Sequence, residues 1–231
     1  MTSRLAAVPA ERMHLYLMLA LTFGTGVVDA VGYLGLDRVF TGNMTGNVVI
    51  LGMGLVGAED LPVLGPLLAL LGFMGGAALG GRVLKHAAGK WTGLTTMLFT
   101  LVAVVTLVLG VVLVLDDSPA QWLMVTTTTL LGAAMGVQAA TARFVAVKDV
   151  TTVVVTSTIT GLAADSQLGS GKGGGSGRRF SAVVLILAGA AAGAALLEVH
   201  LGAGLFLAGA VMLVATLVGA WHARLTAPAG E

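Results

Sequence analysis

Long apolar runs fill almost the whole of this 231-residue sequence and decide what it can fold into. Charged residues make up 10% of the chain, whereas a typical soluble domain carries roughly 25%. A helix needs about 20 mainly apolar residues to cross roughly 30 Å of hydrocarbon, and such stretches recur from Leu15 to Trp221. The sequence therefore predicts an all-α integral membrane protein whose main partner is the lipid bilayer.

Charged residues divide the apolar sequence into eight segments. Two of them fall short of a clean span, because 39–57 opens with the polar string VFTGNMTGN and 150–164 is short and rich in hydroxyl groups. We interpret 13–36 as a retained first helix, since it is too long for the apolar part of a signal peptide. The approximate ranges are 13–36, 39–57, 62–81, 93–115, 120–142, 150–164, 180–197 and 202–222.

The positions of Lys and Arg indicate how many segments cross, because these residues are retained on the cytoplasmic side during insertion. If all eight segments crossed, the 12 basic residues would divide equally between the two sides. If 39–57 and 150–164 leave on the side they entered, only Arg38 lies outside. The charge count alone does not show whether 13–36 or 39–57 is the segment that does not cross. The polar composition of 39–57 indicates that it is this segment. We predict six crossings with both termini cytoplasmic.

The sequence also contains a weak internal repeat. A longer loop in the second half brings Gly72 and Gly76 into correspondence with Gly189 and Gly193, which are small-xxx-small pairs suited to close helix packing or to contacts in a homo-oligomer. The alternative is chance similarity among helices rich in Gly, Ala and Val. A shift of 110 positions aligns Gly26 with Gly136, Val27 with Val137, Ala30 with Ala140, Arg38 with Lys148 and Thr41 with Thr151.

Three crossings in each half would make the second half enter the membrane upside down. We therefore predict one integral membrane domain of two inverted three-helix repeats, 1–115 and 116–231, each with a polar broken or re-entrant segment. A Gly-rich cytoplasmic linker is expected at 166–179.

The sequence predicts no cofactor, metal or nucleic-acid partner. It has no cysteine, and its four histidines lie at helix ends without the spacing of metal ligands. The string GSGKGGGSGRR fails the phosphate-loop pattern, because Ser166 stands where the first Gly is needed and Gly173 follows Lys172. No nucleophile, base and orienting group occur together, so we expect no enzyme activity.

Asp29 is the only carboxylate well inside a predicted span. A charge at that depth costs several kcal/mol unless it is paired or hydrated, so intramembrane acids are candidates for function. Thr22, Thr25 and Tyr33 share its helical face. Asp29 therefore either binds a proton, a cation or a polar solute, or it forms hydrogen bonds that serve assembly alone, for example to the amides of the adjacent broken segment.

The string TGNMTGN forms the second candidate element. Its polar residues alternate with Gly and Met, so an extended backbone would present all of them on one face, whereas a helix would divide them between two. Irregular backbone at membrane depth is tolerated only where it is buried in protein or lines a watery cavity. The alternative is that these side chains join helices by hydrogen bonds. The residues are Thr41, Asn43, Thr45 and Asn47.

The second half repeats this pattern more weakly. Its short segment carries several threonines, of which Thr152 and Thr156 are candidates for the site. Gln138 and Thr141 share a face of the preceding helix and are second-rank candidates, for which helix joining is the simpler role.

Together, GVVDAVGYLGLDRVFTGNMTGNVVILGMGL and GVQAATARF followed by VTTVVVTSTITGLAAD resemble the two signatures of the YoaK-type family. Its members are bacterial membrane proteins of about this length and of unknown function. The resemblance implies six helices, a bacterial plasma membrane location and small-molecule transport. Ala139 departs from the family pattern, in which a polar residue is expected after Gln138, so the second half lacks an evident polar equivalent of Asp29.

These features favour a transporter or channel for a small polar solute, with its site between the two repeats around Asp29 and the TGNMTGN segment. The alternative is a membrane module that acts in assembly or sensing and moves no solute.

Overall fold

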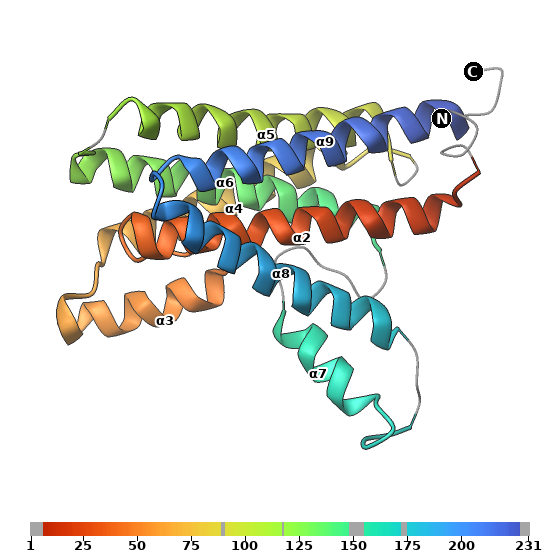
Figure 1. The fold of residues 1–231 in the computed structure, drawn as a ribbon, viewed down its shortest axis with the longest axis horizontal. Helices are drawn as coiled ribbons and strands as arrows, with labels where there is room; N and C mark the ends of the chain where they lie inside the picture. The colour runs from red at the N-terminus through yellow and green to blue at the C-terminus, as the bar shows by residue number, and fades with distance from the viewer. Residues whose placement is uncertain (1–6, 89–90, 117, 148–154, 172–174, 227–231) are drawn as a thin grey trace.

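The computed structural model describes residues 7–88, 91–116, 118–147, 155–171 and 175–226. Within these ranges the chain contains helices and no strand, and six helices are long and apolar enough to cross a membrane. Figure 1 shows most of them running side by side in one bundle, and the all-α fold with six long apolar helices is confirmed. The six are α2 (Ala10–Gly35), α4 (Leu64–Leu84), α5 (Gly93–Val114), α6 (Gln121–Val145), α8 (Ser176–Leu197) and α9 (Ala203–Thr226).

The two short helices are the segments expected not to cross. Helix α3 (Met44–Leu55) has 12 residues and α7 (Thr156–Ala164) has nine, which give about 18 Å and 14 Å at 1.5 Å per residue. Neither length covers a bilayer core of roughly 30 Å. In Figure 1 both short helices stand off the main bundle. A single 3-10 turn, η1 (Ala58–Asp60), lies between α3 and α4 in the chain.

Local sequence explains where the long helices begin. Pro9 directly precedes α2, and Pro66 lies in the first turn of α4, where a missing N–H costs nothing. Thr92 caps α5, accepting the backbone N–H of Thr95 at 3.3 Å, while the Thr95 hydroxyl accepts the N–H of Thr92.

The long helices pair mainly across the two halves of the chain. Helix α2 packs on α8, and α4 packs on α6, while α5 packs on α9. Glycines permit the close approach, because a Cβ at Gly76 would overlap the carbonyl oxygen of Ala133, and one at Gly189 would overlap that of Phe23. As a result α2 is the most buried of the six spans, whereas α4 and α8 present most of their surface outward.

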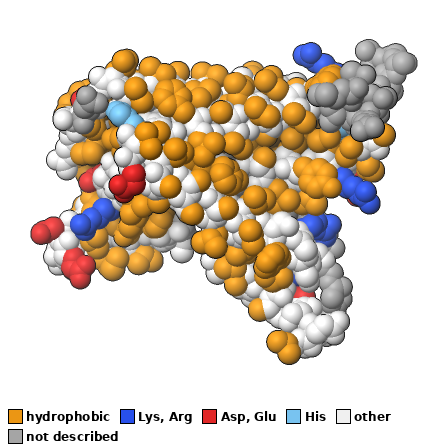
Figure 2. All heavy atoms as spheres, viewed as in Figure 1, with side chains coloured by type: hydrophobic (Ala, Val, Ile, Leu, Met, Phe, Trp, Pro, Cys, Tyr) orange, Lys and Arg blue, Asp and Glu red, His pale blue; other side chains and the backbone are white. Residues whose placement is uncertain are grey.

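Charge is divided between the two ends of the bundle. Figure 2 shows an apolar surface along the helices, with most of the visible basic side chains toward the end that holds the N-terminus and acidic ones toward the other. This apolar surface is what a lipid-embedded protein requires. The first end carries Arg12, Arg82, Lys85, Arg143, Arg178 and Arg224, and the second carries Arg38 with Asp37, Glu59, Asp116 and Glu198.

The predicted linker 166–179 extends too far. Helix α8 begins at Ser176, so the last four residues of that range are helical. Arg179 then reaches back to α7, donating hydrogen bonds from Nη1 to Asp165 Oδ2 at 2.7 Å and to the carbonyl oxygen of Gly161 at 2.8 Å. The described part of the linker is therefore bridged by an ion pair rather than being a free tether.

Candidate functional site

The polar face of α2 lies inside the bundle. Thr22 and Thr25 are buried, and their hydroxyls donate to the carbonyl oxygens of Met18 and Leu21 one turn earlier, at 2.9 and 3.0 Å. Both hydroxyl donors are therefore satisfied within the helix. Asp29 is also buried, but a carboxylate has no donor to give to its own helix backbone. Its partners must come from another segment.

Those partners come from the chain directly after α2. Beyond Gly35 the backbone turns back along the helix, with the N–H of Val39 donating to the Gly32 carbonyl oxygen at 3.3 Å. Two residues later, the N–H groups of Thr41 and Gly42 donate to Asp29 Oδ1 at 2.8 and 2.7 Å. The Thr41 hydroxyl lies 3.4 Å from the same oxygen.

The returning segment lies beside the last turns of α2. Asp29 lies six residues before the end of α2, or about 9 Å along the axis at 1.5 Å per residue. Gly42 also packs against the methyl group of Thr25, a further turn from the end. The chain therefore enters as an irregular segment, breaks beside Asp29 and leaves as helix α3. This hairpin contains the break that the polar segment 39–57 predicted.

Two asparagines hold the hairpin in shape. The Oδ1 atom of Asn43 caps α3 by accepting the N–H of Gly46 at 3.2 Å. Asn47 is fully buried; its Oδ1 accepts the N–H of Phe40 at 2.9 Å and its Nδ2 donates to the carbonyl oxygen of the same residue. The backbone N–H and the carbonyl oxygen of Phe40 are thereby both satisfied.

The four polar residues of TGNMTGN do not share one face. Because α3 begins at Met44, the segment is extended for only part of its length. Thr41 and Asn47 point into the protein and are buried, whereas Asn43 and Thr45 are exposed. The segment is thus partly extended and partly helical, and Thr41 is the one of the four whose side chain reaches Asp29.

A cleft of about 570 Å³ opens beside Asp29, between α2 and α8. One wall contains Tyr33, which is 37% exposed, and Phe40; their rings stack with centroids 4.8 Å apart and planes inclined by 16°. The other lining side chains are apolar and come from both helices, so Asp29 is the one charged residue in the lining. The lining consists of Gly26, Asp29, Ala30, Tyr33, Leu34, Phe40, Val183, Ile186, Leu187, Ala190 and Ala194.

Gln138 joins this region from the second half. It is fully buried, and its Nε2 donates to Thr25 Oγ1 at 2.9 Å, while its Oε1 has no hydrogen-bond partner among the described residues. Thr141 is buried too, but its hydroxyl donates to the carbonyl oxygen of Val137 at 2.8 Å in its own helix. Gln138 therefore links α6 to the polar face of α2, whereas the Thr141 hydroxyl stays within α6.

The threonines of the second polar segment are not brought to Asp29. Thr152 lies outside the described residues, and Thr156 is an exposed residue at the start of α7. Helix α7 packs on α8, and α3 packs on α4, without a contact between the two short helices over the described residues. The expected meeting of both polar segments is therefore not formed by their described parts.

Sequence reasoning missed Phe40, whose ring stacks on Tyr33 and whose backbone is held by Asn47. One signal could have indicated it. Tyr33 and Phe40 flank the charged turn that contains Asp37 and Arg38, so any hairpin that folds back there places the two rings near each other.

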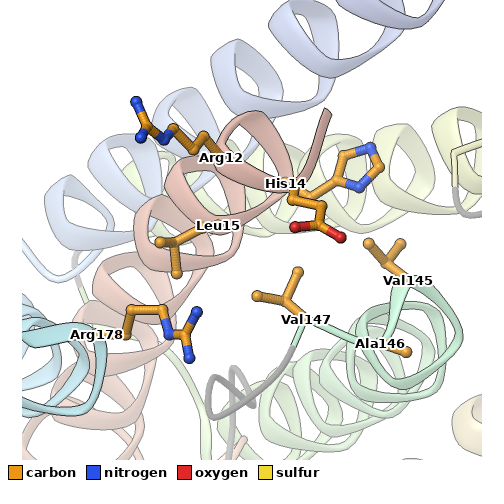
Figure 3. Close-up of a pocket in the computed structure, with 8 residues that line it drawn as sticks. Arg12, His14, Leu15, Val145, Ala146, Val147 and Arg178 are labelled. Carbon is orange, nitrogen blue, oxygen red and sulfur yellow. The ribbon is translucent and has the colours of Figure 1, made fainter. Parts of the chain in front are cut away.

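A second cavity, of about 370 Å³, lies at the basic end of the bundle. Figure 3 shows Arg12, His14 and Leu15 from α2, the chain from Val145 to Val147 at the end of α6, and Arg178 from α8 around it. His14 also stacks on Trp91, with ring centroids 5.6 Å apart. Glu11 lines the same cavity, so its charge is mixed rather than uniformly basic.

No solved structure matches the chain. The UPF0700 transmembrane protein YoaK of Bacillus subtilis (strain 168) is 31% identical over 158 residues, which cover 68% of each chain. The family model described as "Protein of unknown function (DUF1275)" matches residues 17–218. The protein is thus a multi-pass membrane protein that belongs to the DUF1275 family and is similar to YoaK.

Proposed function

We propose that this protein is a transporter or channel for a small polar solute, with its site around Asp29 and the hairpin of residues 39–47. The observation that carries the proposal is a chain break beside the last turns of α2, where the N–H groups of Thr41 and Gly42 meet the Asp29 carboxylate. Broken helices beside an intramembrane acid are typical of transporter binding sites, since irregular backbone is otherwise costly in lipid.

The inverted repeat is part of the same proposal, and the packing of the halves supports it. The shift that aligns Gly26 with Gly136 also takes Phe23 to Ala133. Gly189 packs against the carbonyl oxygen of Phe23, and Gly76 packs against that of Ala133. The two contacts are therefore equivalent under the same shift.

The glycine correspondence differs by one helical turn from the one expected. By their contacts, Gly76 corresponds to Gly189. Gly80, which packs near Val137, corresponds to Gly193, which packs near Val27. Gly72 instead packs against the carbonyl oxygen of Thr129. The glycines considered for subunit contacts therefore pack inside one chain, and the proposed homo-oligomer needs some other surface.

The orientation we propose follows from charge. Lys and Arg gather at the end that holds both termini, so this end lies in the cytoplasm of a bacterial cell. The protein would act in the plasma membrane, without enzymatic chemistry.

The competing function is assembly or sensing without transport, and one observation favours it. Asp29 Oδ1 already accepts two backbone N–H groups, so the carboxylate has a structural task in holding the hairpin. If Asp29 binds a solute, its carboxylate must give up these backbone N–H groups for the solute or bind both at once.

Transport by purified protein in liposomes separates the two functions. We expect osmotic swelling or uptake with at least one solute of a panel containing urea, glycerol, glycine and choline. Asp29→Asn, Asn43→Ala and Asn47→Ala should each abolish it while the protein stays folded by size-exclusion chromatography. Transport that is unchanged in all three variants would remove the site assignment. No movement of any of these solutes would favour the assembly role.

A further inference from the structure

The cavity at the basic end of the bundle differs from the three other clefts in the chemistry of its lining. Clefts of about 570, 520 and 340 Å³ along the helices are lined mostly by apolar side chains. The cavity of about 370 Å³ at the basic end is lined by Glu11, Arg12, His14 and Arg178 together with four apolar residues. Its volume lies within the range of roughly 300–1,000 Å³ that small-molecule sites occupy. This cavity therefore suits a polar or charged occupant.

The cavity lies at the level of the lipid headgroups rather than of the acyl chains. Glu11 is the second residue of α2, and Arg178 is the third residue of α8. Val145, on the opposite wall, is the last residue of α6. Trp91 stacks on His14 beside the cavity, and tryptophan is enriched at the border between hydrocarbon and water. A lipid headgroup and a solute from the water can both reach this position.

The positive and negative side chains of this cavity are not joined to each other. Over the described residues, no ion pair links Glu11 to Arg12 or to Arg178. Figure 3 shows Arg178 reaching past Leu15 toward Val147, whereas Arg12 extends away from them. Arg178 also interacts with other groups of the chain, but its guanidinium has five N–H donors and can serve a ligand as well. An occupant can therefore place an anionic group at Arg178 and a cationic group at Glu11.

The helix ends around the cavity add partial charges of both signs. Helices α2 and α8 begin here, and over the described residues neither N-terminus has a side-chain cap, so their first N–H groups attract an anion. Helix α6 ends here, and its last carbonyl groups attract a cation. Two positive helix ends and one negative end therefore favour an occupant that carries both charges over a simple anion.

We propose that the cavity at the basic end binds a phosphoethanolamine group, with its phosphate at Arg178 and its ammonium at Glu11. A phosphate accepts paired hydrogen bonds from the planar guanidinium, and a primary ammonium donates to a carboxylate. The group has two sources, which are the headgroup of phosphatidylethanolamine in the bilayer and glycerophosphoethanolamine in the water. This inference is independent of transport and of Asp29.

Native mass spectrometry of the protein released from dodecyl maltoside micelles counts bound lipid and tests this site. Phosphatidylethanolamine and phosphatidylglycerol with the same acyl chains are compared at equal concentration. Attraction of the basic end alone would favour phosphatidylglycerol, which carries a net negative charge. The proposed site favours phosphatidylethanolamine, because only that lipid has an ammonium for Glu11. We expect it to bind about threefold more tightly, within the range for an ion pair that water can reach.

Two matched pairs of substitutions locate the binding. Glu11→Gln should remove the preference for phosphatidylethanolamine, whereas Glu198→Gln, at the opposite end of the bundle, should keep it. Arg178→Gln should weaken the binding of both lipids, because it removes the contact to phosphate. Arg82→Gln, at the same end but outside the cavity lining, should leave both affinities unaltered. Equal binding of the two lipids by the parent protein, or a preference that persists in Glu11→Gln, would overturn the proposal. If Arg178→Gln does not fold, the comparison of Glu11→Gln with Glu198→Gln still decides, because Glu11 is exposed.

Competition separates the two sources of the group. Glycerophosphoethanolamine that displaces the lipid at a similar concentration would support the phosphoethanolamine site and assign it to a soluble ligand. Displacement only at large excess, or none, would support the same site and assign it to the lipid. Glycerol 3-phosphate lacks the ammonium, so displacement by it as effective as that by glycerophosphoethanolamine would refute the role of Glu11. Asp29→Asn should leave all these affinities unchanged, which keeps this test separate from that of transport.

Discussion

The side chain of Gln138 donates a 2.9 Å hydrogen bond to the hydroxyl of Thr25, which joins the first long helix of each half inside the bundle. The bond leaves Gln138 Oε1 without a partner over the described residues. The two helices are therefore linked here by a single hydrogen bond, and one buried acceptor, Gln138 Oε1, stays unpaired among the described residues.

A double-mutant cycle of Gln138→Leu and Thr25→Val should give a coupling free energy of about 0.6 kcal/mol, the average for interhelical hydrogen bonds in a membrane protein. Gln138→Leu alone should cost less than about 1 kcal/mol, because it also removes the unpaired oxygen. Reversible unfolding in mixed micelles measures both quantities. A coupling near zero would contradict the bond.

Adjacent glycines of α4 provide a matched pair. Gly76→Ala should destabilise the fold by roughly 1–3 kcal/mol, because its Cβ would overlap the Ala133 carbonyl oxygen and a backbone atom cannot move aside cheaply. Gly75→Ala has open space around its Cβ and should be neutral or stabilising by up to about 1 kcal/mol. Unfolding of both variants under one condition measures the difference, and equal stabilities would refute the close packing of α4 on α6.

The absence of native cysteine makes the hairpin directly testable. Arg38→Cys and Val56→Cys lie before and after the hairpin, and Lys85→Cys lies at the opposite end of α4. A membrane-impermeant maleimide should label the first two in intact cells and the third only after permeabilisation. If Val56→Cys instead behaves like Lys85→Cys, α3 crosses the membrane and the topology is wrong.

Asp29→Ala should loosen the hairpin, because the N–H groups of Thr41 and Gly42 lose their acceptor. Each buried donor left unpaired costs about 1–3 kcal/mol. A cysteine at Ile50, which is buried in α3, should then react faster with a membrane-permeant maleimide than it does with Asp29 intact. Asp29→Asn is the control, since its amide oxygen can still accept; equal rates for Ala and Asn would argue against the anchoring role.

Asp37, in the turn after α2, should give a pH-dependent stability. Burial raises the pKa of this carboxyl above its usual value of 3.8, so the folded protein favours the neutral form. The contribution of Asp37 to the free energy of unfolding is fully present below pH 3.8 and is lost as pH rises through the folded-state pKa. Asp37→Asn should therefore raise the thermal midpoint at pH 7, with the advantage shrinking on acidification. A constant difference between the two proteins at all pH values would contradict this.

Much of the architecture could be predicted from the sequence. The apolar segments became helices α2, α4, α5, α6, α8 and α9, and the ranges 39–57 and 150–164 contain the short α3 and α7. These features depend on local quantities, since a bilayer demands about 20 apolar residues and internally satisfied backbone groups from every span. Asp29 stood out for the same reason, because a carboxylate in such a span is costly.

The partners of Asp29 were decided by tertiary structure. The sequence left open whether TGNMTGN is extended or helical, and the fold made it both, with Thr41 bonded to Asp29 and Thr45 exposed. The choice depends on which backbone N–H groups find an acceptor after the chain turns at Asp37, and that is a long-range match.

The partners of the glycine helices were decided in the same way. A small-xxx-small pair permits close approach but does not say to which helix, so the sequence allowed packing within a chain or between chains. The fold placed Gly76 on Ala133 and Gly189 on Phe23, because only the assembled bundle brings those backbones together. Apolar length and charge in the sequence determine that this chain spans the membrane six times, while packing across its two halves decides which residues meet inside.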